Sequence, residues 1–202
     1  MPTFTIIYDT YCGWCYGAGP VLEALVHTGK VELYHRYLFQ GANAYRMGDG
    51  FGTQAAVIDA RIHALTGQPF GKAYKRNILR SEDEVLESGL SAQAAYLIHD
   101  LGPEIELKLA QALQHGYFVE GRSTQDATFV AETLARLGLN SQRLGAADVV
   151  EGTRSRAADA EQISRLAGCQ GVPTVLRHAE TTEIINLSEF YNSPTDISHL
   201  AA

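Results

Sequence analysis

The feature that most constrains the fold of this chain is a pair of cysteines placed where a buried strand gives way to a helix. The segment Phe4–Tyr8 (FTIIY) is β-branched and aromatic, which predicts a buried strand. Cys12-Gly13-Trp14-Cys15 follows it, and apolar residues at helical spacing then continue to about His27. The alternating segment Val31–Leu38 predicts a second strand, and a β-α-β unit of this length is typical of parallel strands.

The spacing of the two cysteines suits reversible disulfide chemistry. Residues three apart on one helical turn have Cα atoms roughly 5–6 Å apart, inside the window of about 4.4–6.8 Å that a disulfide requires. Unpaired N–H groups and the positive end of the helix dipole favour a thiolate, so we expect a lowered pKa for Cys12. Cys12 is therefore the predicted attacking thiolate, and Cys15 is the predicted resolving thiol.

A Cys-x-x-Cys pair is also half of a structural zinc site, which needs a second pair of ligands. The sequence has one further cysteine, Cys169, and no histidines in an H-x₃₋₅-H spacing. We therefore predict no metal ligands and no organic cofactor, and we interpret the pair as redox-active. A metal clip or a redox-sensing module without enzymatic activity is the non-enzymatic alternative.

Composition narrows the class of protein further. The 202 residues are 46% hydrophobic, and 16 Lys and Arg against 23 Asp and Glu leave a formal net charge of −7. This excess of acid disfavours nucleic-acid and membrane partners. Three cysteines are too few for a disulfide-stapled secreted domain, and no segment has the character of a secretory signal or a membrane span. We therefore expect a cytoplasmic protein.

The middle of the chain is predicted to be helical, with no convincing strand between Thr53 and Gly168. The capping-box spacing of Ser81–Glu84 indicates a helix start. Helical periodicity covers five longer segments: 53–65, 91–101, 103–117, 126–137 and 152–167.

Strand character returns at Val172–Arg177 and Glu183–Asn186, joined by a short hairpin turn, before a short terminal helix from Ser188 that frays at Ser193-Pro194. The predicted fold class is therefore α/β. We expect an α/β domain interrupted by an all-helical insertion between its second and third strands. The predicted boundaries are 1–40 and 152–202 for the α/β domain and 41–151 for the insertion.

Two motifs together resemble the thioredoxin fold. The string TIIYDTYCGWCYG combines a strand, the cysteine pair and Pro20, five residues past the second cysteine. Gly171-Val172-Pro173-Thr174 stands at the start of a late strand, where that fold holds a cis proline against the active disulfide. The helical insertion and the segment Gly116–Gly138 are similar to the cytosolic DsbA-like thiol oxidoreductases of bacteria. The resemblance covers almost the whole chain and implies a thiol–disulfide oxidoreductase.

The resemblance also implies roles for single residues. Pro173 joins the two cysteines as a catalytic-site residue, and a cis turn there leaves the backbone of Val172 free to pair with an extended peptide. A trans proline at a strand start is the alternative. Gly13 and Trp14 complete the predicted substrate-binding residues, with Trp14 either an apolar lid over the thiols or a ring packed on the insertion. The expected partners are proteins or peptides that contain thiols or disulfides, and glutathione is a further candidate. The sequence leaves open whether the protein forms a homodimer.

The chain departs from the periplasmic DsbA oxidants between its cysteines. Those proteins carry a Pro-His pair whose histidine helps to stabilise the thiolate, whereas Gly13-Trp14 supplies no cation. A milder potential, compatible with disulfide reduction or isomerisation, is therefore expected. Kappa-class glutathione transferases and hydroxychromene-carboxylate isomerases are the enzymatic alternative. They share the architecture but use a serine or a single cysteine, so the second cysteine here argues against them.

Three other residues lie close to these motifs. Pro20 has a structural interpretation, and Asp9 and Cys169 have two interpretations each. Pro20 is expected to bend the helix beneath the thiols, because its ring clashes with the carbonyl of Tyr16. Asp9 is expected to cap or hold a loop, with proton exchange with the resolving thiol as the alternative. Cys169 is expected to be a small apolar group, with a third redox thiol as the alternative.

Overall fold

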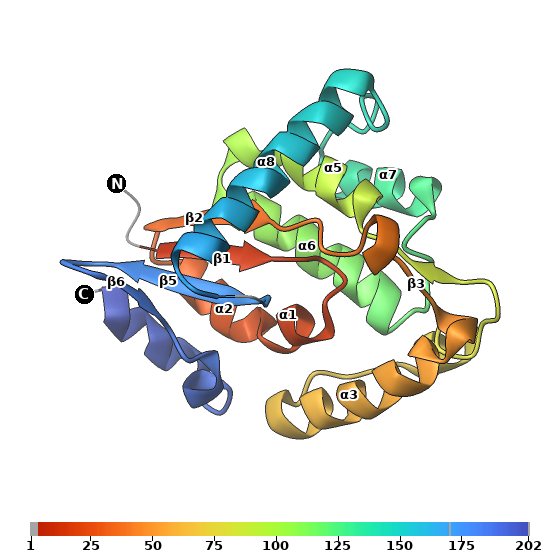
Figure 1. Ribbon diagram of the computed structural model, residues 1–202, viewed down its shortest axis with the longest axis horizontal. Coiled ribbons are helices and arrows are strands. Elements are labelled where there is room, and N and C mark those ends of the chain that lie inside the picture. The colour runs from red at the N-terminus through yellow and green to blue at the C-terminus, as the bar shows by residue number, and fades with distance from the viewer. Residues whose placement is uncertain (1–3, 170, 202) are drawn as a thin grey trace.

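The computed structural model describes residues 4–169 and 171–201 and is built around a four-stranded mixed sheet (Figure 1). β1 (Phe4–Tyr8) lies inside the sheet and is buried along its whole length, as its β-branched and aromatic sequence predicts. It pairs in parallel with β2 (Val31–His35) and antiparallel with β5 (Thr174–His178). β6 (Thr182–Ile184) pairs antiparallel with β5 and forms the outer edge.

The helix after the cysteines is broken rather than continuous. α1 (Gly13–Gly17) ends before Ala18, and α2 (Gly19–Val26) begins after it. Pro20 lies in the first turn of α2, where a helix has no partner for the missing N–H. The expected bend is therefore a break between two short helices, and the redox motif occupies a helix of only five residues.

The insertion is mainly helical, as predicted, and one of its helices was missed. The missed helix, α4, is a short one, and the final helix begins five residues before its predicted start, at Ala147 instead of Gly152. Asp126 caps its helix as the predicted start requires, because its carboxylate accepts a hydrogen bond from the N–H of Phe129. The helices are α3 (Phe51–Thr66), α4 (Lys72–Asn77), α5 (Gly89–Ile98), α6 (Pro103–Phe118), α7 (Ala127–Arg136) and α8 (Ala147–Leu166).

Two short strands correct the prediction of an all-helical insertion, and the second of them also lies in the segment between Thr53 and Gly168 for which no strand was predicted. β4 (Val85–Leu86) pairs antiparallel with β3 (Tyr45–Arg46) in a separate two-stranded sheet. The capping-box prediction at Ser81–Glu84 was also wrong, because the Ser81 hydroxyl accepts from the N–H groups of Asp83 and Glu84 in a turn that leads into β4. A two-residue strand has no periodicity, so only its distant partner identifies it.

Some of the connections between these elements contain short 3₁₀ helices: η1 (Gly41–Asn43), η2 (Met47–Asp49) and η3 (His99–Leu101). The expected single terminal helix is instead divided into η4 (Leu187–Phe190) and η5 (Pro194–Ala201). Pro194 begins the second of these rather than ending the first, and η5 packs against α2.

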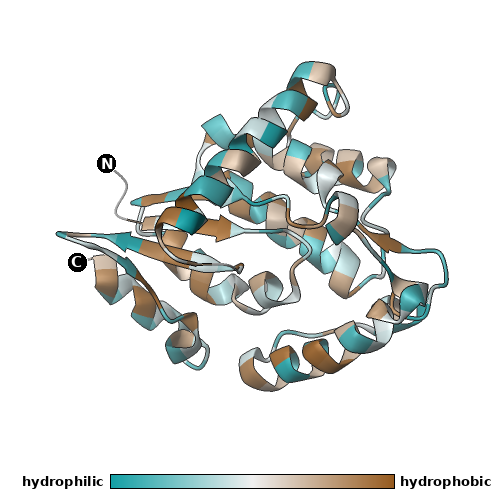
Figure 2. Cartoon of the chain, in the orientation of Figure 1, coloured by the Kyte–Doolittle hydropathy of each residue, from teal (hydrophilic) through white to brown (hydrophobic). Residues whose placement is uncertain are grey.

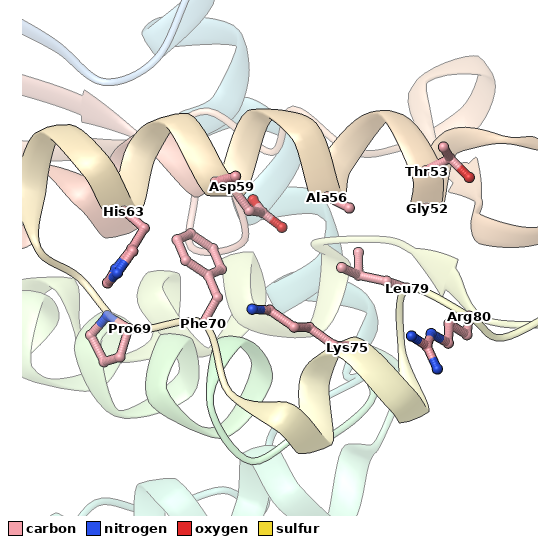
Figure 3. A pocket seen from close by; sticks show the side chains of 11 residues that line it. Gly52, Thr53, Ala56, Asp59, His63, Pro69, Phe70, Lys75, Leu79 and Arg80 are labelled. Atoms are coloured by element: carbon pink, nitrogen blue, oxygen red, sulfur yellow. The ribbon is translucent and has the colours of Figure 1, made fainter.

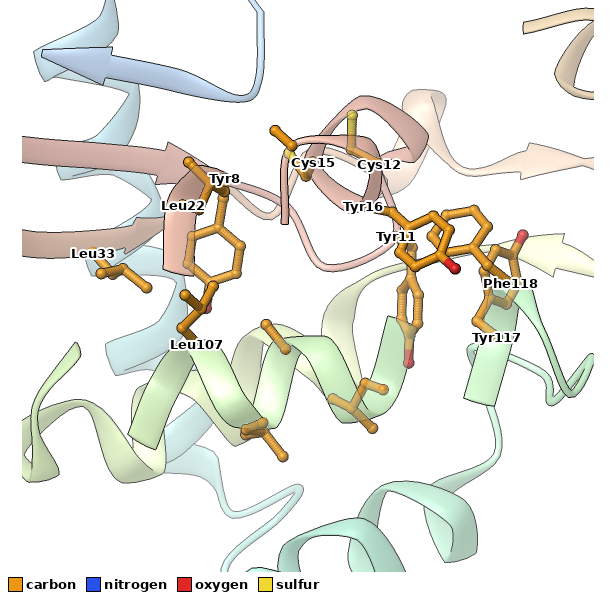
Figure 4. Close-up of a cluster of buried hydrophobic side chains, with 14 of the residues drawn as sticks. Tyr8, Tyr11, Cys12, Cys15, Tyr16, Leu22, Leu33, Leu107, Tyr117 and Phe118 are labelled. Carbon is orange, nitrogen blue, oxygen red and sulfur yellow. The ribbon is translucent and has the colours of Figure 1, made fainter. Parts of the chain in front are cut away.

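One hydrophobic core joins the sheet to the insertion. α6 packs against α2 and β2, and α8 packs against β2. Figure 4 shows this continuity, with Tyr8 and Leu33 of the sheet meeting Leu107 of α6. Figure 2 shows hydrophobic and hydrophilic residues side by side on the helices, as in amphipathic helices around a shared core. The predicted fold class is confirmed, and the division at residues 40 and 152 stays a prediction.

α3 stands apart from α5, α6, α7 and α8 (Figure 1) and contacts α1. It therefore borders the redox motif directly. None of the helices in the described part of the chain is long and apolar enough to cross a membrane.

Candidate active site

The two cysteines of the motif lie at the start of α1, with their sulfur atoms on the same side of the helix (Figure 4). Cys12 is the N-cap residue, with an extended backbone at φ −74° and ψ 121°, and Cys15 is one turn further on. Both are free thiols. Cys12 is 9% exposed and Cys15 only 1%, so Cys12 is the more accessible of the two sulfurs.

The cis proline loop lies against Cys12. The peptide bond between Val172 and Pro173 is cis, and the Cys12 thiol donates to the carbonyl oxygen of Val172 across 3.4 Å. The Cys15 sulfur accepts from the backbone N–H of Asp9, also at 3.4 Å. The structure therefore brings Cys12, Cys15, Val172 and Pro173 together, although 160 residues separate Cys12 from Val172 along the chain.

The two thiols have opposite shifts in acidity. The pKa of Cys12 is lowered, first by a hydrogen bond from the Cys15 thiol and then by the N–H groups of Cys15 and Trp14, while burial and the charge of Asp9 oppose this. The pKa of Cys15 is raised by burial first, then by the hydrogen bond and charge of Cys12. A low-pKa thiol beside a high-pKa thiol is the division of labour expected for an attacking and a resolving cysteine.

Trp14 borders a groove and also contacts the insertion. The groove, of about 460 Å³, is lined by Trp14, Val172, Pro173 and Tyr191 together with residues 184–188. The guanidinium of Arg61 from α3 lies 5.8 Å from the centre of the indole ring. Both interpretations of Trp14 therefore have a physical counterpart, since one face borders the groove and the ring also contacts the insertion.

Gly13 faces the insertion rather than the groove. A Cβ at this position would lie 3.0 Å from Ile62 Cδ1 and 3.2 Å from Asp59 Oδ1, both on α3. Gly13 lines an interior cavity of about 160 Å³ that also contains Cys12 and Asp59. Close approach of α3 to α1 thus accounts for a glycine between the cysteines.

Sequence reasoning missed three residues around the thiols: Tyr191, Arg61 and Asp59. Tyr191 borders the groove, and its pKa is raised by burial first and then by the charges of Cys15 and Cys12, which places its phenol near both sulfurs. Asp59 is 6% exposed and accepts a hydrogen bond from the Tyr74 hydroxyl. No local motif marks these residues, because only the fold brings them to the redox helix.

Asp9 has the expected loop-holding role, because its carboxylate is engaged in hydrogen bonds. Its Oδ1 accepts from the N–H of Tyr11, and its Oδ2 accepts from the N–H of Leu38 and the hydroxyl of Ser88. The side chain is completely buried. Asp9 therefore ties the end of β1 to the chain after β2 and to the start of α5.

Cys169 lies in a different place from the redox pair. Its thiol is partly exposed and donates to the carbonyl of Ser164 across 3.3 Å, in a depression that also contains Arg36 and Arg165. It lines neither the groove nor the cavity beside Cys12. Within residues 4–169 and 171–201, no group of three or more His, Cys, Asp or Glu side chains could hold a metal ion.

The geometry can now be compared with known proteins. The sequence profile of the DsbA-like thioredoxin domain matches residues 3–182, which include both the cysteine pair and the cis proline. The chain belongs to the DsbA-like thioredoxin family. No curated protein matches the chain by sequence.

Solved structures agree with membership in the DsbA-like family. A cytosolic disulfide reductase, DsbM from Pseudomonas aeruginosa, superposes with a TM-score of 0.84 at 26% identity, over 98% of this chain and 96% of that one. The same protein with GSH gives a TM-score of 0.83 at 26% identity, with the same coverage of 98% and 96%. A protein from Nitrosomonas europaea shares the fold, with a TM-score of 0.71 at 18% identity over 99% and 98% of the two chains. This DsbA-like chain is a thiol–disulfide oxidoreductase.

The opposite pKa shifts of the two thiols predict how alkylation of the reduced DsbA-like protein depends on pH. A lowered pKa leaves Cys12 ionised at pH values where an ordinary thiol is protonated, so its reaction with iodoacetamide should persist to lower pH than that of an ordinary thiol. The raised pKa of Cys15 should keep that thiol unreactive over the same range. Peptide mapping by mass spectrometry across a pH series measures both rates. Equal rates for the two cysteines, or a Cys12 midpoint at or above that of a free thiol, would contradict the assignment.

Proposed function

We propose that the chain is a cytoplasmic disulfide reductase whose Cys12–Cys15 dithiol acts on protein or small-molecule disulfides, glutathione disulfide among them. The observation that carries the proposal is the position of Cys12. It combines a lowered pKa with a contact to Val172, one of the residues that line an open groove. A reactive thiolate beside a groove suits a substrate that presents its sulfur from an extended segment.

The reaction proceeds in two exchanges. The Cys12 thiolate attacks one sulfur of the substrate disulfide, a Cys12–substrate disulfide forms, and the other substrate sulfur leaves as a thiolate that takes up a proton. Cys15 then loses its proton and attacks the sulfur of Cys12, which releases the second substrate thiolate. Two electrons pass from the dithiol to the substrate, and an external thiol reductant restores the dithiol by the reverse exchanges.

Binding of an extended substrate is supported by the groove beside Pro173. Trp14 and Tyr191 provide aromatic surface there, and the edge strand β6 leads into the residues that line it. The similar P. aeruginosa DsbM structures, one of a cytosolic disulfide reductase and one of the same protein with GSH, agree with a reducing role and with glutathione as a partner.

The reduction potential tests the direction of electron flow. Equilibration in glutathione redox buffers, followed by thiol trapping, should place the Cys12–Cys15 pair nearer the thioredoxin value of about −270 mV than the DsbA value of about −120 mV. The physical reason is that Gly13-Trp14 supplies no cation to stabilise the thiolate further. Turnover of glutathione disulfide and of insulin should accompany that potential. A value near that of DsbA, with oxidation of reduced substrates faster than reduction, would overturn the reductase assignment.

A further inference from the structure

A second cavity lies in the insertion, outside the thiol site. It occupies about 530 Å³ between α3 and the segment that runs through α4 (Figure 3). Its apolar walls come from Ala56 and Ala60 of α3, Phe70 of the connecting loop, and Leu79. The small side chains on α3 leave this space open, where larger aliphatic residues would fill it. Cys12, Cys15 and Trp14 are not among the residues that line it.

The cavity has an excess of positive charge. Lys75 and Arg80 are exposed at its walls, and neither forms an ion pair with a described residue, although the exposed Arg46 and Arg143 pair with Asp83 and Asp148. Asp59 is the one carboxylate in the described lining, so with His63 neutral the two cations and one anion sum to +1. This local excess occurs in a chain with a formal net charge of −7. Two cations without an ion-pair partner, at separate points along apolar walls, are features that suit an amphipathic anion.

Asp59 forms the wall between this cavity and the redox helix. Its Oδ2 accepts a hydrogen bond from the Tyr74 hydroxyl at 2.9 Å, and Oδ1 lies against Gly13. Burial raises the pKa of this carboxyl to about 6, with Tyr74 and the charge of Lys75 opposing the shift. Figure 3 shows Lys75 extending beneath Asp59 and Phe70, with Arg80 toward the Thr53 end. Both cations thus lie along the cavity, while the carboxyl belongs to its inner wall.

We propose that this cavity binds a small organic carboxylate. The apolar body of the ligand would pack against Ala56, Ala60 and Phe70, and its carboxylate would pair with Lys75 or with Arg80, which lie at separate points along the cavity. An inorganic anion would leave the apolar walls without contact, and an uncharged apolar molecule would leave both cations without a partner. The site is separate from disulfide exchange, because neither cysteine of the pair contributes to it.

Calorimetric titration of the full-length protein with 4-phenylbutyrate tests the proposal. Saturable binding at one site per chain is expected, whereas 4-phenylbutylamine, with the same apolar body and the opposite charge, should not saturate. Replacing Lys75→Gln together with Arg80→Gln should weaken binding of 4-phenylbutyrate by about tenfold or more, since neither cation of the described lining is then left to pair with the carboxylate. Lys72→Gln with Arg76→Gln is the matched control. Both cations lie on α4, as Lys75 does, but neither of them lines the cavity.

The outcomes separate this site from the thiol site. A variant carrying Cys12→Ser and Cys15→Ser should bind 4-phenylbutyrate as the unchanged protein does, so a failure of the proposed function would not remove the binding. Absence of saturation, equal binding of the amine, or equal losses in the two double variants would overturn the proposal. Loss of binding in the cysteine variant would overturn it as well, because the probe would then occupy the groove at Cys12.

Discussion

Replacing Cys12 by serine is expected to lower the turnover of glutathione disulfide and insulin by about a thousandfold or more, because a hydroxyl cannot supply the thiolate that attacks the disulfide. Cys12 is the thiol with the lowered pKa and the greater exposure of the pair, so no other sulfur in the motif can substitute for it. Steady-state turnover with a thiol reductant in excess measures the effect. The overall fold should persist, since serine is smaller than cysteine.

Cys15→Ser should also stop turnover, but at a different step. Cys12 can still attack, so the mixed disulfide forms and then has no internal thiol to resolve it. Mass spectrometry of the intact protein after exposure to glutathione disulfide should show one added glutathionyl group, which Cys12→Ser lacks. Cys169→Ser is the control and should leave turnover within about twofold of the unchanged protein, because Cys169 lies outside the site.

Two results would contradict this assignment. Turnover that survives Cys12→Ser would remove the attacking role from Cys12. A tight glutathione complex together with isomerase activity that survives Cys15→Ser would instead favour the kappa-class type of chemistry, which needs a single nucleophile.

The second large effect is expected on stability. Asp9→Ala should lower the free energy of unfolding by about 3–5 kcal/mol, because each buried group left without a partner costs about 1–3 kcal/mol. The carboxylate accepts from Tyr11, Leu38 and Ser88, and it is completely buried. Urea denaturation of the reduced protein, followed by circular dichroism, measures the change.

Asp49→Ala is the matched control for this measurement. Asp49 is exposed in η2 and is expected to change the free energy of unfolding by less than about 0.5 kcal/mol. A loss of less than about 1 kcal/mol for Asp9→Ala would show that water replaces the carboxylate, and that the loops after β1 and β2 do not depend on it.

Local sequence was sufficient for the features that a short segment encodes. The apolar run of β1, the cysteines three apart, and the proline at the start of α6 each act within one turn or one strand. The prediction that Pro173 lies beside Cys12 required the resemblance to a known fold, because the residues themselves do not show it. The groove, by contrast, depends on Tyr191 and the chain after β6, for which no motif gave a signal.

The sequence by itself determined the nature of the chemistry, because two thiols on one helical turn can form and break a disulfide whatever surrounds them. The place of Cys12 at a helix start already predicted that it is the more acidic thiol, and the tertiary structure added the burial of Cys15 and the hydrogen bond between the two thiols, which act through space to shift the two pKa values in opposite directions. It also decided what borders the pair: α3 brings Asp59 and Arg61 to the motif from a separate helix. Such contacts join residues far apart in the chain, and their energies depend on distance and burial rather than on order in the sequence.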